Sequence, residues 1–152
     1  VVIFMIVFYR LPGLLASIAL LIYVAITLAL FKLIPVTLTL AGIGGFILSI
    51  GMAVDANILI FARMKEELLA GKSISQAVNE GFQRAWPSIR DRNFNSLFVC
   101  AILFIFATSF IKGFALTLAL GILVSLLSAI FITRIFLQVI VGNWAEKAKW
   151  LL

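Results

Sequence analysis

One apolar run, from Leu40 to Phe61, constrains this chain more than any other feature, because it contains a single charged residue, Asp55. About 20 consecutive apolar residues in a helix are enough to cross the hydrocarbon core of a bilayer. Other runs of similar length flank this one, and hydrophobic residues make up 64% of the whole sequence. The sequence therefore predicts an all-α integral membrane protein, folded as a polytopic helix bundle.

Turn residues and charges divide the chain into segments. Residues 1–9 are apolar but too few to cross a bilayer, so we expect them to continue a helix that begins outside this chain. Pro12 and Gly13 predict a tight turn after them, and Lys112-Gly113 predicts a second one. Complete spans are predicted at about 14–31, 40–61, 93–111 and 114–141, with a polar connector at 62–90 and an interfacial tail at 142–152.

The connector has the pattern of an amphipathic helix. Ser73 and Gln76 have the spacing of a capping box, which predicts a helix start. The apolar residues that follow recur at helical spacing: Ile74, Ala77, Val78, Phe82, Ala85 and Trp86. We expect this helix to lie on the membrane surface or the bundle, either as a simple connector or as a coupling element or partner site. Pro87 is expected to begin the next span.

The basic residues predict the orientation of the spans. Only Lys32 and Lys112 fall on one side of the predicted membrane, whereas the other side has Arg10, Arg63, Lys65, Lys72, Arg84, Arg90, Arg92, Arg134, Lys147 and Lys149. Cytoplasmic loops are enriched in Lys and Arg, so the connector and the C-terminus are expected in the cytoplasm. This arrangement explains the net charge of +6 without a nucleic-acid partner.

Asp55 is the first candidate for function. An Asp at the centre of a membrane helix costs about +3 kcal/mol on insertion scales, and such residues commonly mark ion or proton paths. We expect reversible protonation, with Asn57 as a polar neighbour. The alternative is a structural carboxyl satisfied by neighbouring hydroxyl groups or by an Arg.

Asp91 and Asn93 repeat the Asp-x-Asn pattern of residues 55–57. In the first turn of a predicted span, Asp91 is equally explained by the helix dipole and by ion pairs with Arg90 and Arg92. Asn93 is expected to hydrogen-bond across helices. An enzyme is not expected: neither Asp lies in a G-x-G-D motif, there is no His, and the single Cys100 lies in an apolar span.

Small residues recur along two of the spans. Gly42, Gly45 and Ser49 follow one another on the third, and the fifth contains Gly121, Ser125, Ser128 and Ala129. Because small side chains let helix backbones approach closely, we expect close helix packing along these spans, which would also allow sliding or tilting around the polar site. Thr117 and Thr133 are weaker candidates for a polar lining.

Two stretches resemble a known family. The segment AVDANILIFARMKEEL and the segment KGFALT are similar to the SecD subunits of the bacterial SecDF protein-export complex, within the resistance–nodulation–division superfamily. The resemblance extends over nearly the whole chain and implies one half of a pseudo-symmetric twelve-helix core. The second family motif usually reads D-A-N-x-T-T, whereas this chain reads D-R-N-F-N-S, with Arg92 in place of Ala.

That resemblance implies a function. It suggests a subunit that uses the proton motive force, with no cofactor, to promote polypeptide export across the bacterial inner membrane. The partners implied are SecF, the SecYEG channel, YajC, YidC, the exported polypeptide and the lipid bilayer. The proton-path residues implied are Asp55, Asn57, Asp91 and Asn93, and Arg92 is expected to pair with Asp91. Two alternatives stay open: another exporter of the superfamily, for small molecules or lipids, and a purely structural scaffold.

Overall fold

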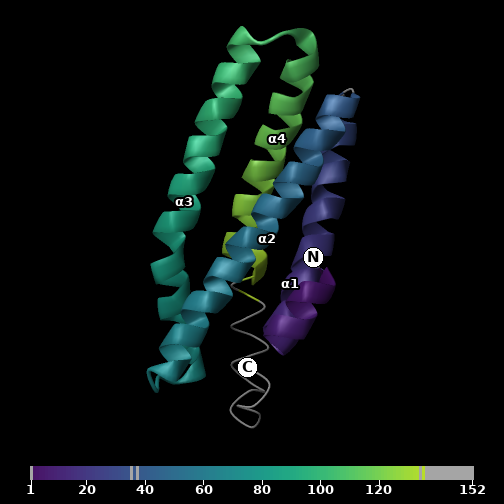
Figure 1. Cartoon of the computed structure of the whole chain (residues 1–152). Coiled ribbons are helices and arrows are strands. Elements are labelled where there is room, and N and C mark those ends of the chain that lie inside the picture. Colours follow the sequence, from purple (N-terminus) through teal and green to yellow (C-terminus); the bar gives the residue numbers. More distant parts are fainter. Residues whose placement is uncertain (1, 35, 37, 134, 136–152) are drawn as a thin grey trace.

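The protein is a bundle of long helices (Figure 1). The computed structural model describes residues 2–34, 36, 38–133 and 135, and in this part of the chain every regular element is helical. The elements are α1 (Val2–Leu33), α2 (Leu40–Leu69), α3 (Ile74–Phe106), α4 (Ser109–Leu127) and the π-helix η1 (Ser128–Thr133). The all-α class predicted from the sequence is confirmed for these residues. The predicted tail at 142–152 and the end of the last span lie outside them.

Three helical segments are long and apolar enough to cross a membrane: Gly13–Leu33, Leu40–Leu69 and Ser109–Phe131. Large apolar side chains cover the outside of the bundle; Ile47, Phe98 and Phe106 are 62%, 66% and 82% exposed. A water-soluble protein rarely exposes apolar surface on this scale. The arrangement is that of a multi-pass membrane protein.

The chain reverses direction inside α1. A methyl group added to Gly13 would lie 2.0 Å from the carbonyl oxygen of Met5, although residues eight apart in a straight helix are separated by about 12 Å. Residues near the N-terminus therefore fold back along the rest of α1, and Figure 1 places the N-terminus part-way along it. Met5 is buried, and the Tyr9 ring lies 5.6 Å from that of Phe61. The reversal lies between Met5 and Gly13, within backbone that is helical throughout, so the turn predicted at Pro12 and Gly13 is not itself tested.

The helix predicted within the connector begins where the sequence predicts. Ser73 accepts a hydrogen bond from the backbone of Gln76, and the Gln76 side chain accepts one from the backbone of Ser73, which confirms the capping box. The predicted restart at Pro87 is wrong, because Pro87 lies inside α3. Connector and span are thus one continuous helix, and Asp91 lies in its middle. The helix-dipole explanation for Asp91 therefore fails.

The turn between α3 and α4 also differs from the prediction. It lies at Ala107 and Thr108, so the predicted span 93–111 and the predicted turn at Lys112-Gly113 are both wrong. Thr108 has an extended backbone, with ψ at 163°, and its carbonyl accepts from the backbone N–H groups of Ile111 and Lys112. The Lys-Gly pair therefore belongs to the start of α4. Gly71 is the one described residue with positive φ, at 84°, in the α2–α3 loop.

Small residues bring α2 and α4 together, which agrees with the close helix packing that they predict. Gly42, Gly45 and Ser49 are buried on α2, and Gly121 and Ser125 on α4. A methyl group on Gly45 would lie 2.6 Å from the carbonyl oxygen of Phe114. Thr117 donates a hydrogen bond of 2.9 Å to the Gly42 carbonyl, which ties the two helices together.

Candidate functional site

The central charged pair joins Asp55 on α2 to Arg92 on α3. Arg92 Nη1 lies 3.3 Å from Asp55 Oδ2, and Arg92 Nη2 donates to the Met52 carbonyl oxygen, also at 3.3 Å. The Asp55 side chain is 59% exposed and that of Arg92 41%. Asp55 is therefore not enclosed within this chain: it lies on the outer face of α2, away from the buried small-residue stripe. We call Asp55 and Arg92 the mid-helix pair.

The pairing follows from the register of an antiparallel hairpin. Asp55 is 15 residues after Leu40, the first residue of α2, and Arg92 is 14 residues before Phe106, the last of α3. At 1.5 Å per residue, both lie about 21–22 Å from the same end of the bundle. Arg92 is therefore level with Asp55. The sequence-based assignment of Arg92 to the cytoplasmic side, just before the predicted span 93–111, does not fit this position.

The other predicted site residues lie apart from this pair: one is exposed at the surface and two are buried inside the bundle. Asp91 is 67% exposed and pairs at 2.8 Å with its neighbour Arg90. Asn57 and Asn93 are buried inside the bundle. The structure therefore brings Asp55 together with Arg92, whereas the sequence-based expectation paired Arg92 with Asp91.

Asn93 adds an unsatisfied polar atom to the interior. Its Nδ2 donates to the Ile89 carbonyl at 2.7 Å, while its Oδ1 is buried without a hydrogen-bond partner among the described residues. The same holds for Ser125 Oγ on α4. Ser125 is 16 residues after the start of α4, or about 24 Å along the helix, so it lies near the level of the mid-helix pair. Two unsatisfied buried polar atoms thus lie near the level of the mid-helix pair.

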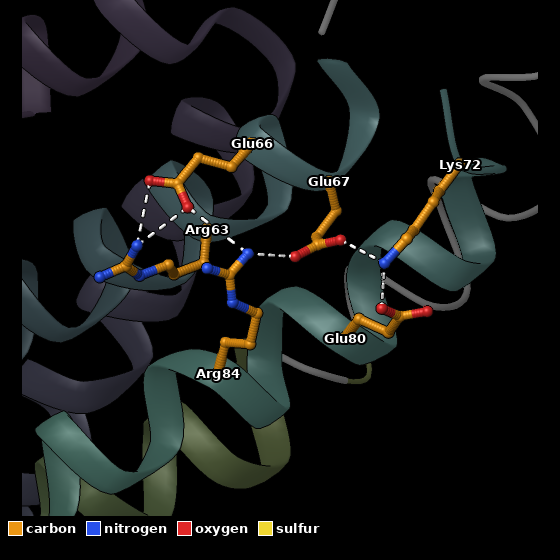
Figure 2. A network of polar contacts seen from close by, with 6 residues as sticks. All are labelled: Arg63, Glu66, Glu67, Lys72, Glu80 and Arg84. Atoms are coloured by element: carbon orange, nitrogen blue, oxygen red, sulfur yellow. Dashed lines mark hydrogen bonds and ion pairs between the residues drawn. The ribbon is translucent and has the colours of Figure 1, made fainter. Parts of the chain in front are cut away.

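A second charged cluster closes the α2–α3 loop end. Figure 2 shows Arg63, Glu66, Glu67, Lys72, Glu80 and Arg84, which we call the loop clasp. Glu67 is only 4% exposed; it accepts from Lys72 at 2.5 Å on one oxygen and from Arg84 on the other. Lys72 also bonds Glu80, and Arg63 bonds Glu66 at 2.9 Å. Three carboxylates thus meet three cations, and the clasp joins α2 to the start of α3.

Lys72 of the clasp keeps its charge at neutral pH. Glu67, and after it Glu80, raise the pKa of Lys72 above its ordinary value by hydrogen bonding to the ammonium group. A Lys is already protonated at neutral pH, with an ordinary pKa of about 10.4, so this shift strengthens a charge that is present throughout the physiological range. The clasp is consequently a fixed structural link.

An Arg was one alternative partner predicted for Asp55, but Arg92 was not identified as that residue, and the loop clasp was not predicted. The mid-helix pair could be found from the spacing along the sequence. Asp55 follows the first residue of α2 by nearly as many residues as Arg92 precedes the last residue of α3. That signal depends on α3 being continuous through Pro87, which the sequence did not predict. The clasp has only a weak signal, namely alternating acids and bases on both sides of Gly71.

Known proteins resemble this chain closely. The family model "Protein export membrane protein SecD/SecF, C-terminal" matches residues 1–143. A protein translocase subunit SecD from Dehalococcoides mccartyi is 64% identical, over 97% of this chain and 34% of its own length. The SecD of Thermobaculum terrenum is 57% identical, over 99% of this chain and 30% of its own length. The chain thus spans about a third of these relatives.

Solved structures give the same fold. A crystal structure of SecDF in its super-membrane-facing form matches with a TM-score of 0.90 and 39% identity, over 94% of this chain and 20% of that one. A second SecDF structure, of a translocon-associated membrane protein from Thermus thermophilus, gives a TM-score of 0.88 and 38% identity over 97% of this chain and 20% of that one. Since the family model covers nearly all of the sequence and the fold agrees, the chain belongs to the SecD/SecF family of protein-export membrane proteins.

Proposed function

We propose that this chain is the membrane part of an auxiliary subunit of the Sec translocase, which uses the proton motive force to promote polypeptide export. The observation that carries the proposal is the position of Asp55: a carboxylate half-way along an apolar membrane helix, open on the outer side of the bundle. Family membership supplies the context, because the relatives are named protein translocase subunits. No cofactor is needed for proton transfer through a carboxylate.

In this proposal Asp55 takes up and releases the proton, while Asn57 and Asn93 supply polar groups inside the bundle. Asp91 is assigned a lesser part, because it is already paired with Arg90 at the surface. The proposed partners are SecF, which would complete a twelve-helix core, the SecYEG channel, YajC, YidC and the exported polypeptide. The exposed apolar faces suit contacts with a second helix bundle and with lipid.

The proposed location is the bacterial inner membrane, with the α2–α3 loop and the C-terminus in the cytoplasm. The positions of the charges support this orientation. Lys32 and Lys112 belong to the α3–α4 end of the bundle, whereas Lys72 and the clasp belong to the opposite end. Loops rich in Lys and Arg face the cytoplasm.

The test is precursor export in cells whose only copy of the intact protein is Asp55→Asn, with Asp55→Glu as the matched control. Asparagine keeps the size of the side chain but cannot exchange a proton. We expect export to fall to the level of cells without the protein, at unchanged membrane abundance, and Glu to restore part of it. Full export in the Asn variant would overturn the proton role and favour a scaffold.

A further inference from the structure

Two adjoining hollows form a groove between α3 and α4 that is polar at one end and apolar at the other. The polar part, about 230 Å³, lies at the α3–α4 end of the bundle, and Lys112, Ser109 and Thr39 are among its lining residues. Phe104 and Leu116 line both parts, so the two hollows meet. The apolar part, about 210 Å³, is otherwise lined by small or aliphatic residues of the same two helices: Leu97, Cys100, Ala101, Ala115 and Ala119.

The groove runs along the helices from the end of the bundle into its membrane-spanning part. Lys112 is three residues after Ser109, the first residue of a membrane-spanning segment, and Ala119 is seven residues further along α4. Seven helical residues measure about 10.5 Å, and one leaflet of the hydrocarbon core is about 15 Å thick. The polar part therefore lies near the membrane surface, and the apolar part extends through most of one leaflet.

Lys112 carries a charge that no described carboxylate neutralises. Its ammonium group lies 6.0 Å from the centre of the Phe104 ring, which is 47% exposed. The Ser109 hydroxyl is exposed in the same hollow and can donate a hydrogen bond. The described carboxylates all lie half-way along the α2–α3 hairpin or at its clasp end: Asp55, Asp91, Glu66, Glu67 and Glu80. An anion that reaches Lys112 must therefore come from outside this part of the chain.

The charge decides which kind of molecule suits the groove. A helix of another protein could pack against small residues, but it would have to bring an acid to Lys112 at the membrane surface. A phospholipid has a phosphate at the surface and an apolar chain below it, in the same order as the two parts of the groove. Basic pockets between membrane helices bind such headgroups.

We propose that this groove binds one phospholipid of the leaflet at the α3–α4 end of the bundle. Lys112 and Ser109 hold its phosphate, and one acyl chain lies in the apolar part between α3 and α4. The lipid fills the space between the two helices on this side, so it stabilises their packing. The binding does not depend on protonation of Asp55, which lies about half-way along α2.

The experiment titrates the intact protein in detergent with phosphatidylglycerol and measures bound lipid by native mass spectrometry. Wild type should bind one lipid more tightly than any further one. Lys112→Gln should weaken this first binding about fivefold, the contribution of one Lys near an anionic lipid surface, whereas Lys112→Arg should retain it. The matched control, Lys32→Gln, removes a Lys at the same end of the bundle that does not line the groove, and should leave binding unchanged.

A second pair of variants tests the apolar part. Ala101→Leu fills the groove and should weaken the first binding, whereas Ala25→Leu adds the same side chain to an exposed position on α1 and should not. Diacylglycerol with the same chains lacks the phosphate, so wild type should bind it as weakly as Lys112→Gln binds phosphatidylglycerol. Inorganic phosphate lacks the chains and should not displace the lipid at equal concentration.

The proposal is overturned if no first lipid binds more tightly than the rest, or if Lys32→Gln or Ala25→Leu loses binding to the same extent. It is also overturned if co-purification with SecF, the proposed partner, blocks the first lipid, because a protein helix would then occupy the groove. Melting temperatures show whether each variant is folded. If Lys112→Gln is not, equal binding of diacylglycerol and phosphatidylglycerol to wild type would still overturn the phosphate site.

Discussion

The loop clasp and the mid-helix pair are both contacts between α2 and α3, yet they are built in opposite ways. In the clasp, a nearly buried Glu67 bonds two cations at once, and the neighbouring charges are also paired. In the mid-helix pair, a single carboxylate meets a single guanidinium, and both side chains stay substantially exposed. Full pairing favours a permanent link, whereas the mid-helix pair lies on an open face of the hairpin and has no second ion pair among the described residues.

Replacing Glu67 should have the largest effect on the stability of the hairpin. Glu67→Gln keeps the shape of the side chain but weakens both charge-assisted hydrogen bonds, and it leaves Lys72 and Arg84 facing a neutral group. We expect a several-fold drop in membrane abundance, with export per remaining molecule retained. Glu66→Gln is the matched control, because Glu66 is adjacent, 49% exposed and paired at the surface; it should change little.

The comparison between clasp and pair would be broken by the opposite pattern. If Glu67→Gln abolished export at normal abundance, the clasp would belong to the proton machinery and would not be a fixed link. Immunoblotting of membranes together with the export assay distinguishes these results.

The pH dependence of the clasp can be tested at Lys72. The pKa of Lys72 is raised in the folded protein, so its contribution to stability is fully present below the ordinary value of about 10.4 and is lost as the pH rises through the folded value. The difference in melting temperature between wild type and Lys72→Gln should thus be constant from neutral to mildly alkaline pH, and should shrink only in strong alkali. A difference that varies around neutral pH would contradict a permanently charged clasp.

The smallest effect is expected at Asp91. The Asp91 and Arg90 side chains are 67% and 51% exposed, and surface ion pairs contribute about 0–1 kcal/mol. Asp91→Asn should accordingly leave abundance and export close to wild type. A loss of export as large as that of Asp55→Asn would place a second carboxylate on the proton path and would remove the contrast between the two Asp-x-Asn segments.

Much of the fold could be predicted from the sequence, because it depends on local patterns. The apolar runs predicted the helical membrane class, the Ser73–Gln76 spacing predicted the start of α3, and the small residues predicted close helix packing, although not which helices would meet. Pro87 misled the prediction, since a proline inside a long helix can be tolerated when neighbouring helices pack against it. The turn predicted at Lys112-Gly113 was also wrong, because α4 already begins at Ser109, after Thr108.

The candidate site was only partly predictable. Asp55 was recognisable because a charge in an apolar span is conspicuous within the sequence itself. Its partner was not, because Arg92 is 37 residues away and has acids and bases next to it. Only the continuity of α3 decides that Arg92 faces Asp55 while Arg90 takes Asp91, and this continuity depends on tertiary packing.

The closed end of the α2–α3 hairpin has a geometric consequence. Because the clasp joins α2 to α3 near their shared loop, the two helices are held together at one end and are free to separate at the other. Asp55 is 14 residues from Leu69, the last residue of α2, and 15 from its first. At 1.5 Å per residue it therefore lies about half-way along α2. If the angle between α2 and α3 opens at the clasp, the far ends of the two helices therefore separate about twice as much as Asp55 and Arg92 do.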